Sequence, residues 1–330
     1  MTKPQKVAAI VNPCAAGGKA ARRWPELESL LERSLGPVTT RFTHSPGAGI
    51  GIARQLLREG YDLLVAVGGD GTINEVANGF FEHDRIIRPE ARLGILPLGT
   101  GGDFRRTLSV PLNPRKAVEI LAEGLPLLID VGKVSFLDKN GTSESRYFVN
   151  MVSFGMGGHV AARARNSLSH FGGKAAFLWA TLVTFLSYRG RQIKLKVASN
   201  PTEMDFVVTN VAVGNGQFHG GGMRPCPTAA LNDGLFEVTV IDYVGTIELI
   251  SSLPVLYSGE VYKHPRVHHL RTSSLSVEST VVTQIEVDGE ALGTLPLEVS
   301  ILPRRLPVLI SASSPLFALS DNPESRQTPA

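Results

Sequence analysis

A single carboxylate stands inside a glycine-rich turn, Gly68-Gly69-Asp70-Gly71-Thr72, which directly follows the apolar run 63–67. A strand that ends in such a turn places bare backbone N–H groups at the carboxyl end of a sheet, where open α/β proteins bind nucleotides. Glycine allows positive φ angles and the close approach of a phosphate. Thr72 and Glu75 have the spacing of a capping box, which predicts that a helix follows. Taken alone, the turn also fits a capped helix that binds no ligand.

Three more glycine-containing turns follow predicted strands in the same half of the chain, at residues 12–19, 45–49 and 96–104. Each turn opens a predicted helix, so a parallel sheet would gather all four turns at one edge. Several helix N-termini would then converge on a positive, donor-rich pocket suited to phosphates. Two common phosphate-binding patterns are absent from the sequence. The turn at 12–19 lacks the glycine spacing of a Walker A loop, and no strand runs into G-x-G-x-x-G.

The elements that must position these turns alternate between apolar strands and helices up to about residue 128. The predicted strands are 7–11, 38–42, 63–67 and 93–96. The predicted helices are 20–35, 49–59, 72–80 and 114–122. This alternation predicts a mostly parallel sheet with helices on both faces.

After Asp130 the pattern changes to short β-rich runs separated by turn residues, which is typical of an antiparallel sandwich or barrel. The predicted strands are 131–137, 147–153, 192–198, 206–213, 235–241, 276–282 and 284–287, with one more at 308–311. Two helical segments interrupt them, at 163–188 and 246–256. The last residues, 322–330, are expected to be disordered.

The bulk composition excludes several classes of protein. A chain of 330 residues suggests two domains. A net charge of +3 with 7% aromatic residues does not indicate a nucleic-acid partner. The two cysteines, Cys14 and Cys226, predict neither a disulfide framework nor a metal cluster. The N-terminus has no signal-peptide core, and the apolar stretch 175–188 is shorter than the roughly 20 residues of a spanning helix, so a cytoplasmic protein is expected.

Five segments together resemble the catalytic domain of the diacylglycerol kinase family, in particular its soluble bacterial lipid kinases, with sphingosine and ceramide kinases as relatives. The segment 68–76 resembles the family signature, 12–19 is similar to its N-P-x-S-G-x-G-K loop, and 97–104 to P-L-G-T-x-N-D-F. In the second half, 232–238 resembles the D-G-x-x-x-V strand, and 288–290 matches D-G-E. The matches keep the family's order from residue 7 to about 305.

Two residues depart from the family pattern. Ala15 or Ala16 stands where the family has serine, and Gly102 stands where it has asparagine. These changes remove a hydroxyl and an amide that could contact phosphate or ribose. Backbone N–H groups are expected to replace much of that contact.

The resemblance implies that the turns of the first half hold the nucleotide, ATP. The implied contact residues are Asn12, Pro13, Cys14, Ala15, Ala16, Thr43, Gly68, Gly69, Asp70, Gly71, Thr72, Ile73, Asn74 and Thr100. Phosphoryl transfer depends mainly on charge neutralisation and positioning, which suits a site built from turns and few acids.

The resemblance also implies the metal and catalytic residues. Asp70 would act through Mg²⁺ bound to the ATP phosphates. Asp233, with the backbone carbonyls of Ala230 and Leu235, would hold a second, structural Mg²⁺. Glu290 would be the general base on the lipid hydroxyl, with Asp288 beside it.

The helical segment 175–186 leaves two interpretations open. Five of its residues fall on one face at helical spacing: Phe177, Leu178, Thr181, Leu182 and Phe185. The segment could pack on the sandwich as an ordinary helix. It could instead line an acyl-chain channel, with Arg163, Arg165, Arg189 and Arg191 as a basic rim against phospholipid headgroups.

The sequence therefore predicts a Rossmann-like α/β domain of the NAD-kinase and diacylglycerol-kinase type over residues 1–128, rejoined by about 306–319. An antiparallel β-sandwich at 129–305 would bind the lipid, and 320–330 would be a disordered tail. The expected protein is an ATP- and Mg²⁺-dependent lipid kinase, acting on diacylglycerol, phosphatidylglycerol or a sphingoid base in a cleft between the domains. Peripheral contact with the inner membrane surface and a homodimer through the C-terminal domain are expected partners.

Two alternatives remain at this point. An NAD kinase shares the G-G-D-G-T turn, but the D-G-E segment and the apolar helix argue against it. A nucleotide- or lipid-binding regulator without turnover is conceivable because the first loop is altered. The presence of Asp70, Asp233 and Glu290 argues against such a regulator.

Overall fold

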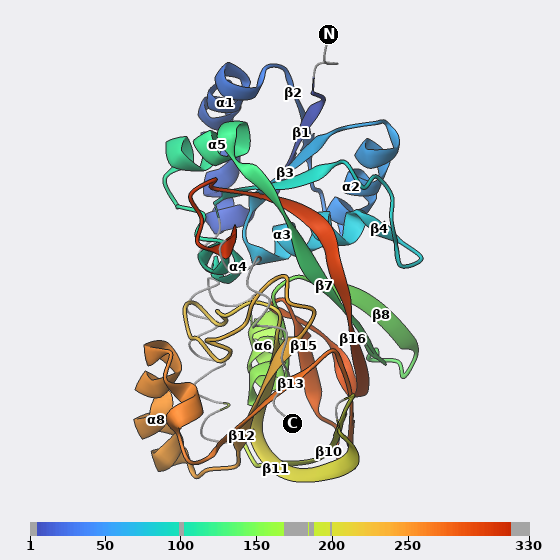
Figure 1. The fold of residues 1–330 in the computed structure, drawn as a ribbon, viewed down its shortest axis with the longest axis vertical. Helices are drawn as coiled ribbons and strands as arrows, with labels where there is room; N and C mark the ends of the chain where they lie inside the picture. Colours follow the sequence, from blue (N-terminus) through green and yellow to red (C-terminus); the bar gives the residue numbers. More distant parts are fainter. Residues whose placement is uncertain (1–4, 99–101, 168–183, 185–187, 199, 318–330) are drawn as a thin grey trace. The chain divides into compact units, whose positions relative to one another are not determined.

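The computed structural model describes residues 5–98, 102–167, 184, 188–198 and 200–317 (Figure 1). The chain divides into two compact units. Unit 1 comprises Met1–Val131, Leu231–Asp233 and Pro303–Ala330, and unit 2 comprises Gly132–Ala230 and Gly234–Leu302. Thr100, most of the predicted helix 175–186 and the predicted tail 320–330 lie outside the described residues.

Unit 1 is built on a parallel sheet. Its strand order is β6 (Arg92–Pro97), β3 (Leu63–Gly68), β1 (Val7–Val11) and β2 (Val38–Phe42), with every neighbouring pair parallel. The end of β16 (Glu290–Ile310) joins β6 in parallel at Val308 and Leu93. All residues of β1 and β3 are apolar or glycine and are buried, as expected for central strands covered on both faces.

The first four helices of unit 1 each follow a strand, and the fifth follows the fourth. In chain order they are α1 (Ala15–Leu35), α2 (Ala48–Arg58), α3 (Asp70–Gly79), α4 (Asp103–Thr107) and α5 (Pro114–Glu123). A short hairpin of β4 (Phe81–Glu82) and β5 (Arg85–Ile86) follows α3. α3 packs closely on α2, because a Cβ at Gly79 would lie 2.4 Å from the Ala53 Cβ.

Unit 2 is an all-β structure with helices at its edge. Its remaining strands are β7 (Leu125–Leu137), β8 (Ser143–Phe148), β9 (Met151–Gly155), β10 (Arg191–Val197), β11 (Asn200–Gly214), β12 (Phe236–Asp242), β13 (Val267–Thr272), β14 (Ser274–Ser279) and β15 (Gln284–Val287). Its helices are α6 (Met156–Ser167), α8 (Thr246–Ser258) and the short η1 (Val261–Lys263).

Antiparallel hydrogen bonding in unit 2 follows a closed circuit: β9, β11, β10, β14, β16, β15 and back to β9. The enclosed core is apolar, and the rings of Phe148 and Phe236 stack in it at 5.4 Å. Gly132 makes room for this pair, since a Cβ there would lie 2.1 Å from the Phe148 ring. The predicted combination of an α/β unit and an all-β unit is confirmed.

Four features of the sequence-based element prediction differ from the structure. The predicted strand 147–153 is two strands, β8 and β9, interrupted at Val149 and Asn150. Strand β13 was not predicted, and β16 is far longer than the predicted strand 308–311. Helix α6 begins at Met156, seven residues before the predicted helix 163–188. Among the described residues, no helix is long and apolar enough to cross a membrane.

Candidate active site

The glycine-rich turn 68–72 of unit 1 is held in place by close packing at Gly68 and by the hydrogen bonds of Asp70. A Cβ at Gly68 would lie 2.3 Å from the Thr72 Oγ1, so only glycine fits at the end of β3. Helix α3 begins at Asp70, with Gly69 as its N-cap. The Asp70 carboxylate accepts hydrogen bonds from three consecutive backbone N–H groups, those of Gly102 (2.8 Å), Asp103 (3.0 Å) and Phe104 (3.1 Å).

Asp70 therefore caps the N-terminus of α4 from another helix. An ionised carboxylate has about four acceptor positions, and three of these are taken. As far as the described residues show, one position remains for a further donor or a cation. The main role of these contacts is to connect the two predicted nucleotide turns through Asp70. They leave room for a single further contact, to Mg²⁺ or to a water molecule bound to Mg²⁺.

Glu75 acts in the same way on a second helix. Its Oε1 accepts the N–H of Gly47 and its Oε2 accepts the N–H of Gly49, each at 2.8 Å, at the start of α2. The predicted capping box of Thr72 and Glu75 is wrong, because α3 begins at Asp70, two residues before Thr72. The N-termini of α2 and α4 are thus bound by the chain's own carboxylates. The N-termini of α1 and α3 are therefore the better candidates for binding a phosphate.

The first turn is tied to the Asp70 turn by Asn12. Its backbone N–H donates to the Val67 carbonyl, and its Nδ2 donates to the Thr72 Oγ1 at 3.2 Å. Its Oδ1 accepts the N–H of Cys14 at 3.0 Å, which folds the turn back on itself. The predicted residues Asn12 and Thr72 therefore lie together at the carboxyl ends of β1 and β3.

A left-handed stretch follows in this turn. Ala16, Gly17 and Gly18 have φ angles of 53°, 67° and 80°, so the regular part of α1 begins only after Gly18. No atom lies within 4 Å of the position a Cβ would take at Gly17 or Gly18, so the backbone conformation and not crowding favours glycine. Successive N–H groups in such turns form concavities that bind anions, and this backbone geometry does not require the serine that Ala15 or Ala16 replaces.

Other predicted nucleotide residues are placed less directly. Thr43 lies immediately after β2, and its N–H donates to the Val11 carbonyl at 2.9 Å, next to Asn12. The side chains of Ile73 and Asn74 are buried, and Asn74 accepts hydrogen bonds from Asn78. Ile73 and Asn74 therefore support the turn from inside, and the N–H of Ile73 donates to the Gly69 carbonyl at 3.1 Å.

The predicted structural metal ligand Asp233 lies in the segment Leu231–Asp233, which contacts place in unit 1. The buried Asp130 holds this region: its Oδ1 accepts the N–H of Arg304 at 2.7 Å, and the Arg304 Nε donates to the Asn232 carbonyl at 3.2 Å. A donor set of one carboxylate and the carbonyls of Ala230 and Leu235 consists of oxygen only, which fits Mg²⁺. Among the described residues, no cluster of three His, Cys, Asp or Glu side chains could hold a metal.

The D-G-E segment forms a hairpin turn in unit 2. Asp288 and Gly289 both have positive φ angles, 46° and 91°, and Val287 pairs with Glu290 across the turn. This is the type I′ geometry that D-G favours between two antiparallel strands. The turn ends β15 and places Glu290 as the first residue of β16.

The Asp288 carboxylate also holds three consecutive backbone N–H groups, those of Val149 (2.9 Å), Asn150 (3.0 Å) and Met151 (2.8 Å). Its own N–H donates to the Met151 carbonyl at 2.9 Å, and the residue is only 5% exposed. These contacts explain why the strand 147–153 breaks: the amides at the break point to Asp288. The contacts assign Asp288 a positioning role, while Glu290 is half-buried and adjoins the turn.

A second buried carboxylate supports the same hairpin. Glu286 on β15 accepts a hydrogen bond from the Ser153 Oγ at 3.2 Å and pairs with the His219 Nε2 at 3.2 Å. The loop that carries His219 is fixed to the strand break, because the Asn150 Nδ2 donates to the Phe218 carbonyl at 2.9 Å. No motif in the sequence marks this pairing of His219 with Glu286.

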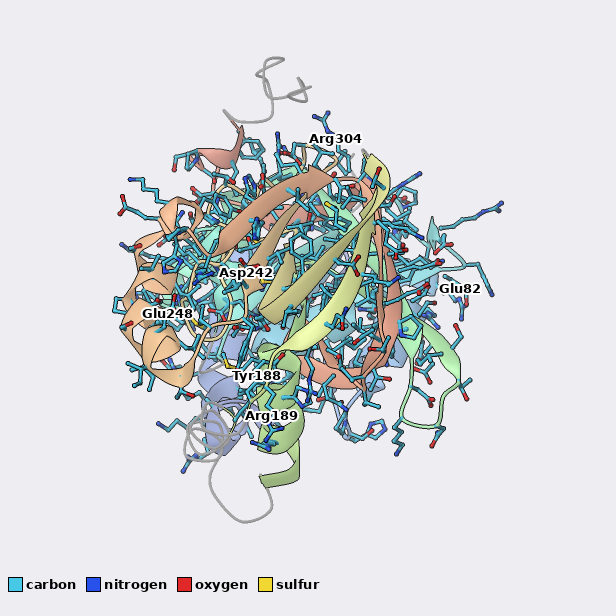
Figure 2. All side chains as sticks on the ribbon, turned by 90° about the horizontal axis from the view of Figure 1, so that it is seen from below. Glu82, Tyr188, Arg189, Asp242, Glu248 and Arg304 are labelled. Carbon is cyan, nitrogen blue, oxygen red and sulfur yellow. The ribbon has the colours of Figure 1, made fainter. Side chains whose placement is uncertain are left out.

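The basic rim predicted around 163–191 is partly internal. Burial, together with the nearby Arg191 and Arg163, lowers the pKa of His159 to about 4, so its imidazole is neutral near pH 7. The guanidinium of Arg191 lies 3.3 Å from the His159 Nε2 and 5.6 Å from the Tyr188 ring centroid. Arg189, labelled beside Tyr188 in Figure 2, is exposed, as is Arg163.

Besides Glu286, sequence reasoning missed the buried carboxylates Asp103 and Asp130. Asp103 is buried and pairs with Arg106 at 2.6 Å, and Asp130 is fully buried. Asp103 stood inside a quoted motif, which could have marked it. Asp130 stood at the change from helical to β-rich sequence without any motif, so no local signal marked it.

Comparison with known proteins covers both units. Residues 6–134 match the diacylglycerol kinase catalytic domain, and residues 150–310 match the YegS C-terminal NAD kinase beta sandwich-like domain. A protein named probable lipid kinase YegS-like from Pseudomonas aeruginosa is 33% identical over 316 residues, which cover 94% of this chain and 96% of that protein. The chain belongs to the diacylglycerol kinase family.

Other relatives of this chain support the same family assignment. A diacylglycerol kinase from Staphylococcus saprophyticus is 30% identical over 287 residues, 87% of this chain and 89% of that protein. The crystal structure of a diacylglycerol kinase from Bacillus anthracis superposes with a TM-score of 0.69 at 20% identity, covering 95% of this chain and 99% of that one, and shows the same fold. The family is one of lipid kinases, so the predicted enzyme class is confirmed.

Proposed function

We propose that this lipid kinase uses ATP and Mg²⁺ to phosphorylate a hydroxyl of a diacylglycerol-like lipid, with diacylglycerol, phosphatidylglycerol and sphingoid bases as the candidate substrates. One observation carries the proposal: the D-G dipeptides at 70–71 and 288–289 are each fixed by the aspartate carboxylate on three consecutive amides, next to the groups that phosphoryl transfer needs. These groups are the N–H-rich turns of unit 1 and the Glu290 carboxylate of unit 2.

In this proposal unit 1 binds the nucleotide. The turns at 12–16 and 68–74, with Thr43 and Thr100, contact the ATP, and the N–H groups near Ala16 and Gly17 face its phosphates. Mg²⁺ bound with ATP neutralises phosphate charge. Asp70 contributes its single remaining acceptor position, and its three amide contacts keep the two turns in register.

Glu290 accepts the proton of the lipid hydroxyl. The hydroxyl oxygen forms a bond to the γ-phosphorus while the bond from that phosphorus to the β–γ bridging oxygen breaks, which releases ADP and the phosphorylated lipid. Asp288 positions Glu290 by fixing the hairpin turn. Asp233, with the carbonyls of Ala230 and Leu235, would hold a structural Mg²⁺.

Because lipids of this kind reside in bilayers, we propose that the enzyme works as a peripheral protein on the inner surface of the cell membrane. The test of the reaction is labelling with [γ-³²P]ATP of diacylglycerol, phosphatidylglycerol, sphingosine and NAD. The proposal requires that one of the lipids is labelled and that NAD is not. Labelling of NAD alone would support an NAD kinase, and a protein that binds ATP but labels nothing would be a regulator.

Nucleotide binding can be tested separately from turnover with the two cysteines. Cys14 is exposed in the first turn, whereas Cys226 is fully buried and burial raises the pKa of its thiol to about 12. Alkylation should therefore modify Cys14 alone, and saturating MgATP should slow it at least about fivefold if the turn binds nucleotide. An unchanged alkylation rate would argue against the assignment of this turn.

A further inference from the structure

Helix α8 carries apolar side chains on both its inner and its outer sides. Its thirteen residues contain one charged side chain, Glu248. Large apolar side chains are usually buried, yet Ile247, Ile250 and Tyr257 of α8 are exposed, and α8 lies at the outside of unit 2 (orange in Figure 1). The apolar side chains on the outer side of α8 are therefore not covered by any other described part of the chain.

The exposed apolar residues form one continuous stripe. We define the α8 stripe as Tyr243, Ile247, Ile250, Pro254 and Tyr257, which recur every three or four residues. Helical spacing places Ile247, Ile250, Pro254 and Tyr257 on one side of α8, and Tyr243 lies in the non-helical segment just before the helix. Ile247 is 87% exposed, Ile250 53%, Tyr257 54% and Tyr243 44%.

The opposite side of α8 is already occupied. Leu249 is buried and forms a small apolar cluster with Val244, Met156 and Leu253. These residues fill the side of the helix that faces the sheet. The helix therefore gains nothing by rotating the stripe inward.

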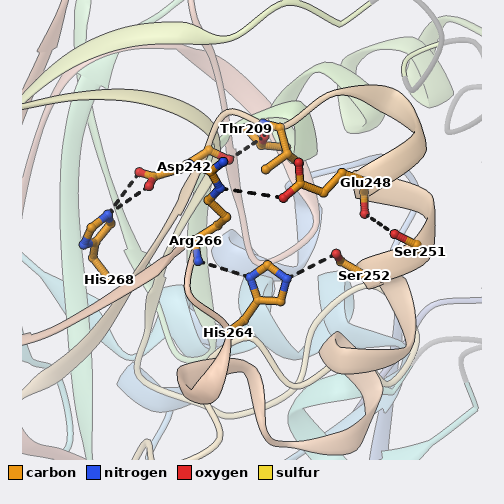
Figure 3. A network of polar contacts seen from close by, with 9 residues as sticks. Thr209, Asp242, Glu248, Ser251, Ser252, His264, Arg266 and His268 are labelled. Atoms are coloured by element: carbon orange, nitrogen blue, oxygen red, sulfur yellow. Dashed lines mark hydrogen bonds and ion pairs between the residues drawn. The ribbon is translucent and has the colours of Figure 1, made fainter.

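Polar contacts fix this orientation, as Figure 3 shows. The Arg266 Nε lies 3.7 Å from the Glu248 Oε1, and His264 and Ser252 are joined by a hydrogen bond of 3.3 Å. His264 also accepts the N–H of Arg266 through Nδ1, so its Nε2 carries the proton and donates to Ser252. The only charge of α8 is thus matched at its flank, and the stripe itself is uncharged.

We propose that the α8 stripe is the surface through which the enzyme rests on a phospholipid bilayer. This inference rests on the proposed function, since an enzyme that phosphorylates a membrane lipid must bind the membrane surface. Ile side chains flanked by tyrosines suit the boundary between acyl chains and headgroups, because a tyrosine has an apolar ring and a polar tip.

Charge next to the stripe fits an anionic membrane. A Cβ at Gly190 would lie 2.6 Å from the Tyr243 ring, so the backbone beside the exposed Arg189 packs against the stripe. A cation at this place can reach a phospholipid headgroup. The stripe and Arg189 together form the pattern of an interfacial surface, with an apolar face and a basic edge.

A second copy of the chain fits the stripe less well. A fully exposed side chain of this size has on the order of 200 Å², so the stripe residues with the measured exposures present about 500 Å². A stable protein–protein interface buries about 800 Å² on each partner. A bilayer has no such minimum area, since even a single lipid chain contributes to membrane binding.

The test is a double variant, Ile247→Asp with Ile250→Asp, in the full-length enzyme. Its binding to sedimented vesicles of phosphatidylcholine and phosphatidylglycerol should fall at least about tenfold, as should phosphorylation of long-chain substrate within those vesicles. Phosphorylation of a short-chain, water-dispersed form of the same lipid should stay within about twofold of wild type. Leu112→Asp, in unit 1 at 56% exposure, is the matched control and should change neither.

Vesicle binding that equals wild type in the double variant would overturn the inference. So would a wild-type dimer that the double variant converts to monomer without loss of vesicle binding, since the stripe would then join two copies. If the double variant fails to fold, Ile247→Ser at the most exposed position should still weaken vesicle binding severalfold. If wild type labels no lipid yet the double variant loses vesicle binding, the proposed function fails while this inference stands.

Discussion

Asp70 in unit 1 and Asp288 in unit 2 use one device in two different settings. Each stands in a D-G dipeptide, and each carboxylate accepts hydrogen bonds from three consecutive backbone amides of a distant segment. Asp70 holds the N-terminus of α4, where the amides would otherwise be unsatisfied helix ends. Asp288 holds the break between β8 and β9, inside the apolar surroundings of the sandwich.

The difference between the two settings lies in burial. The Asp288 carboxylate is 5% exposed and its amides have no access to water, whereas the Asp70 site is only partly buried. An anchor in the core should therefore matter more for stability, and an anchor at the edge should matter more for the shape of a ligand turn. In both places the acid in the motif shapes the backbone of a distant segment.

The largest expected effect on stability is that of Asp288→Ala. Removal of the carboxylate leaves three buried amides without an acceptor, which should lower the free energy of unfolding by about 3–5 kcal/mol. Thermal unfolding of the full chain should then begin about 10 °C lower. Asp288→Asn keeps one oxygen acceptor, so its free energy of unfolding should fall by about half as much. Equal stability of the wild type, Asp288→Ala and Asp288→Asn would contradict the anchoring role of Asp288.

A smaller effect is expected for Asp70→Ala. The amides of Gly102 to Phe104 can turn to water, so the loss should be about 1–2 kcal/mol, close to that of a helix cap. The KM for ATP should rise severalfold, because the two turns lose their connection. Glu75→Gln is the control, since it weakens the contacts at the start of α2 by a similar amount. If Glu75→Gln raised the KM for ATP as much as Asp70→Ala does, loosening any of these helix ends would be enough to weaken ATP binding, and the connection through Asp70 would not be special.

The smallest effect concerns His159 and pH. Its pKa is about 4 in the folded chain and 6.5 when exposed, so between these values the unfolded chain binds more protons and stability falls as pH falls. The melting temperature of the wild-type protein should fall between pH 7 and pH 4.5, and in His159→Gln this fall should be smaller by a few degrees. The exposed His44→Gln should leave that slope unchanged, and a slope that is the same in all three proteins would contradict the burial of His159.

The parts of the fold and site that could be predicted are those with local signals. Strands β1 and β3 are continuous apolar runs, and the Asp288-Gly289 turn follows from D-G between two short strands. The anchors had no such signal, because Asp288 and its amides are separated by 137–139 residues. A sequence shows which residues can accept a hydrogen bond, but distant pairing depends on the tertiary fold.

The missed strands have a similar cause. Strand β13 carries His268, His269 and Arg271 among its residues, and β16 contains three prolines and two arginines, so neither reads as an apolar run. Both form because neighbouring strands supply their hydrogen-bond partners. The same is true of Glu75, whose helix-capping partner lies on α2 and not on its own helix.

The most direct test of the account compares Glu290→Gln with Asp288→Asn in one assay of lipid phosphorylation at saturating ATP. Glu290→Gln should lower kcat at least about 100-fold, because the hydroxyl proton loses its acceptor, and should leave the melting temperature unchanged. Asp288→Asn, assayed well below its own melting temperature, should keep kcat within about tenfold while it melts earlier. The opposite pattern, with Asp288→Asn stable and inactive and Glu290→Gln active, would contradict the division between an anchoring and a reacting carboxylate.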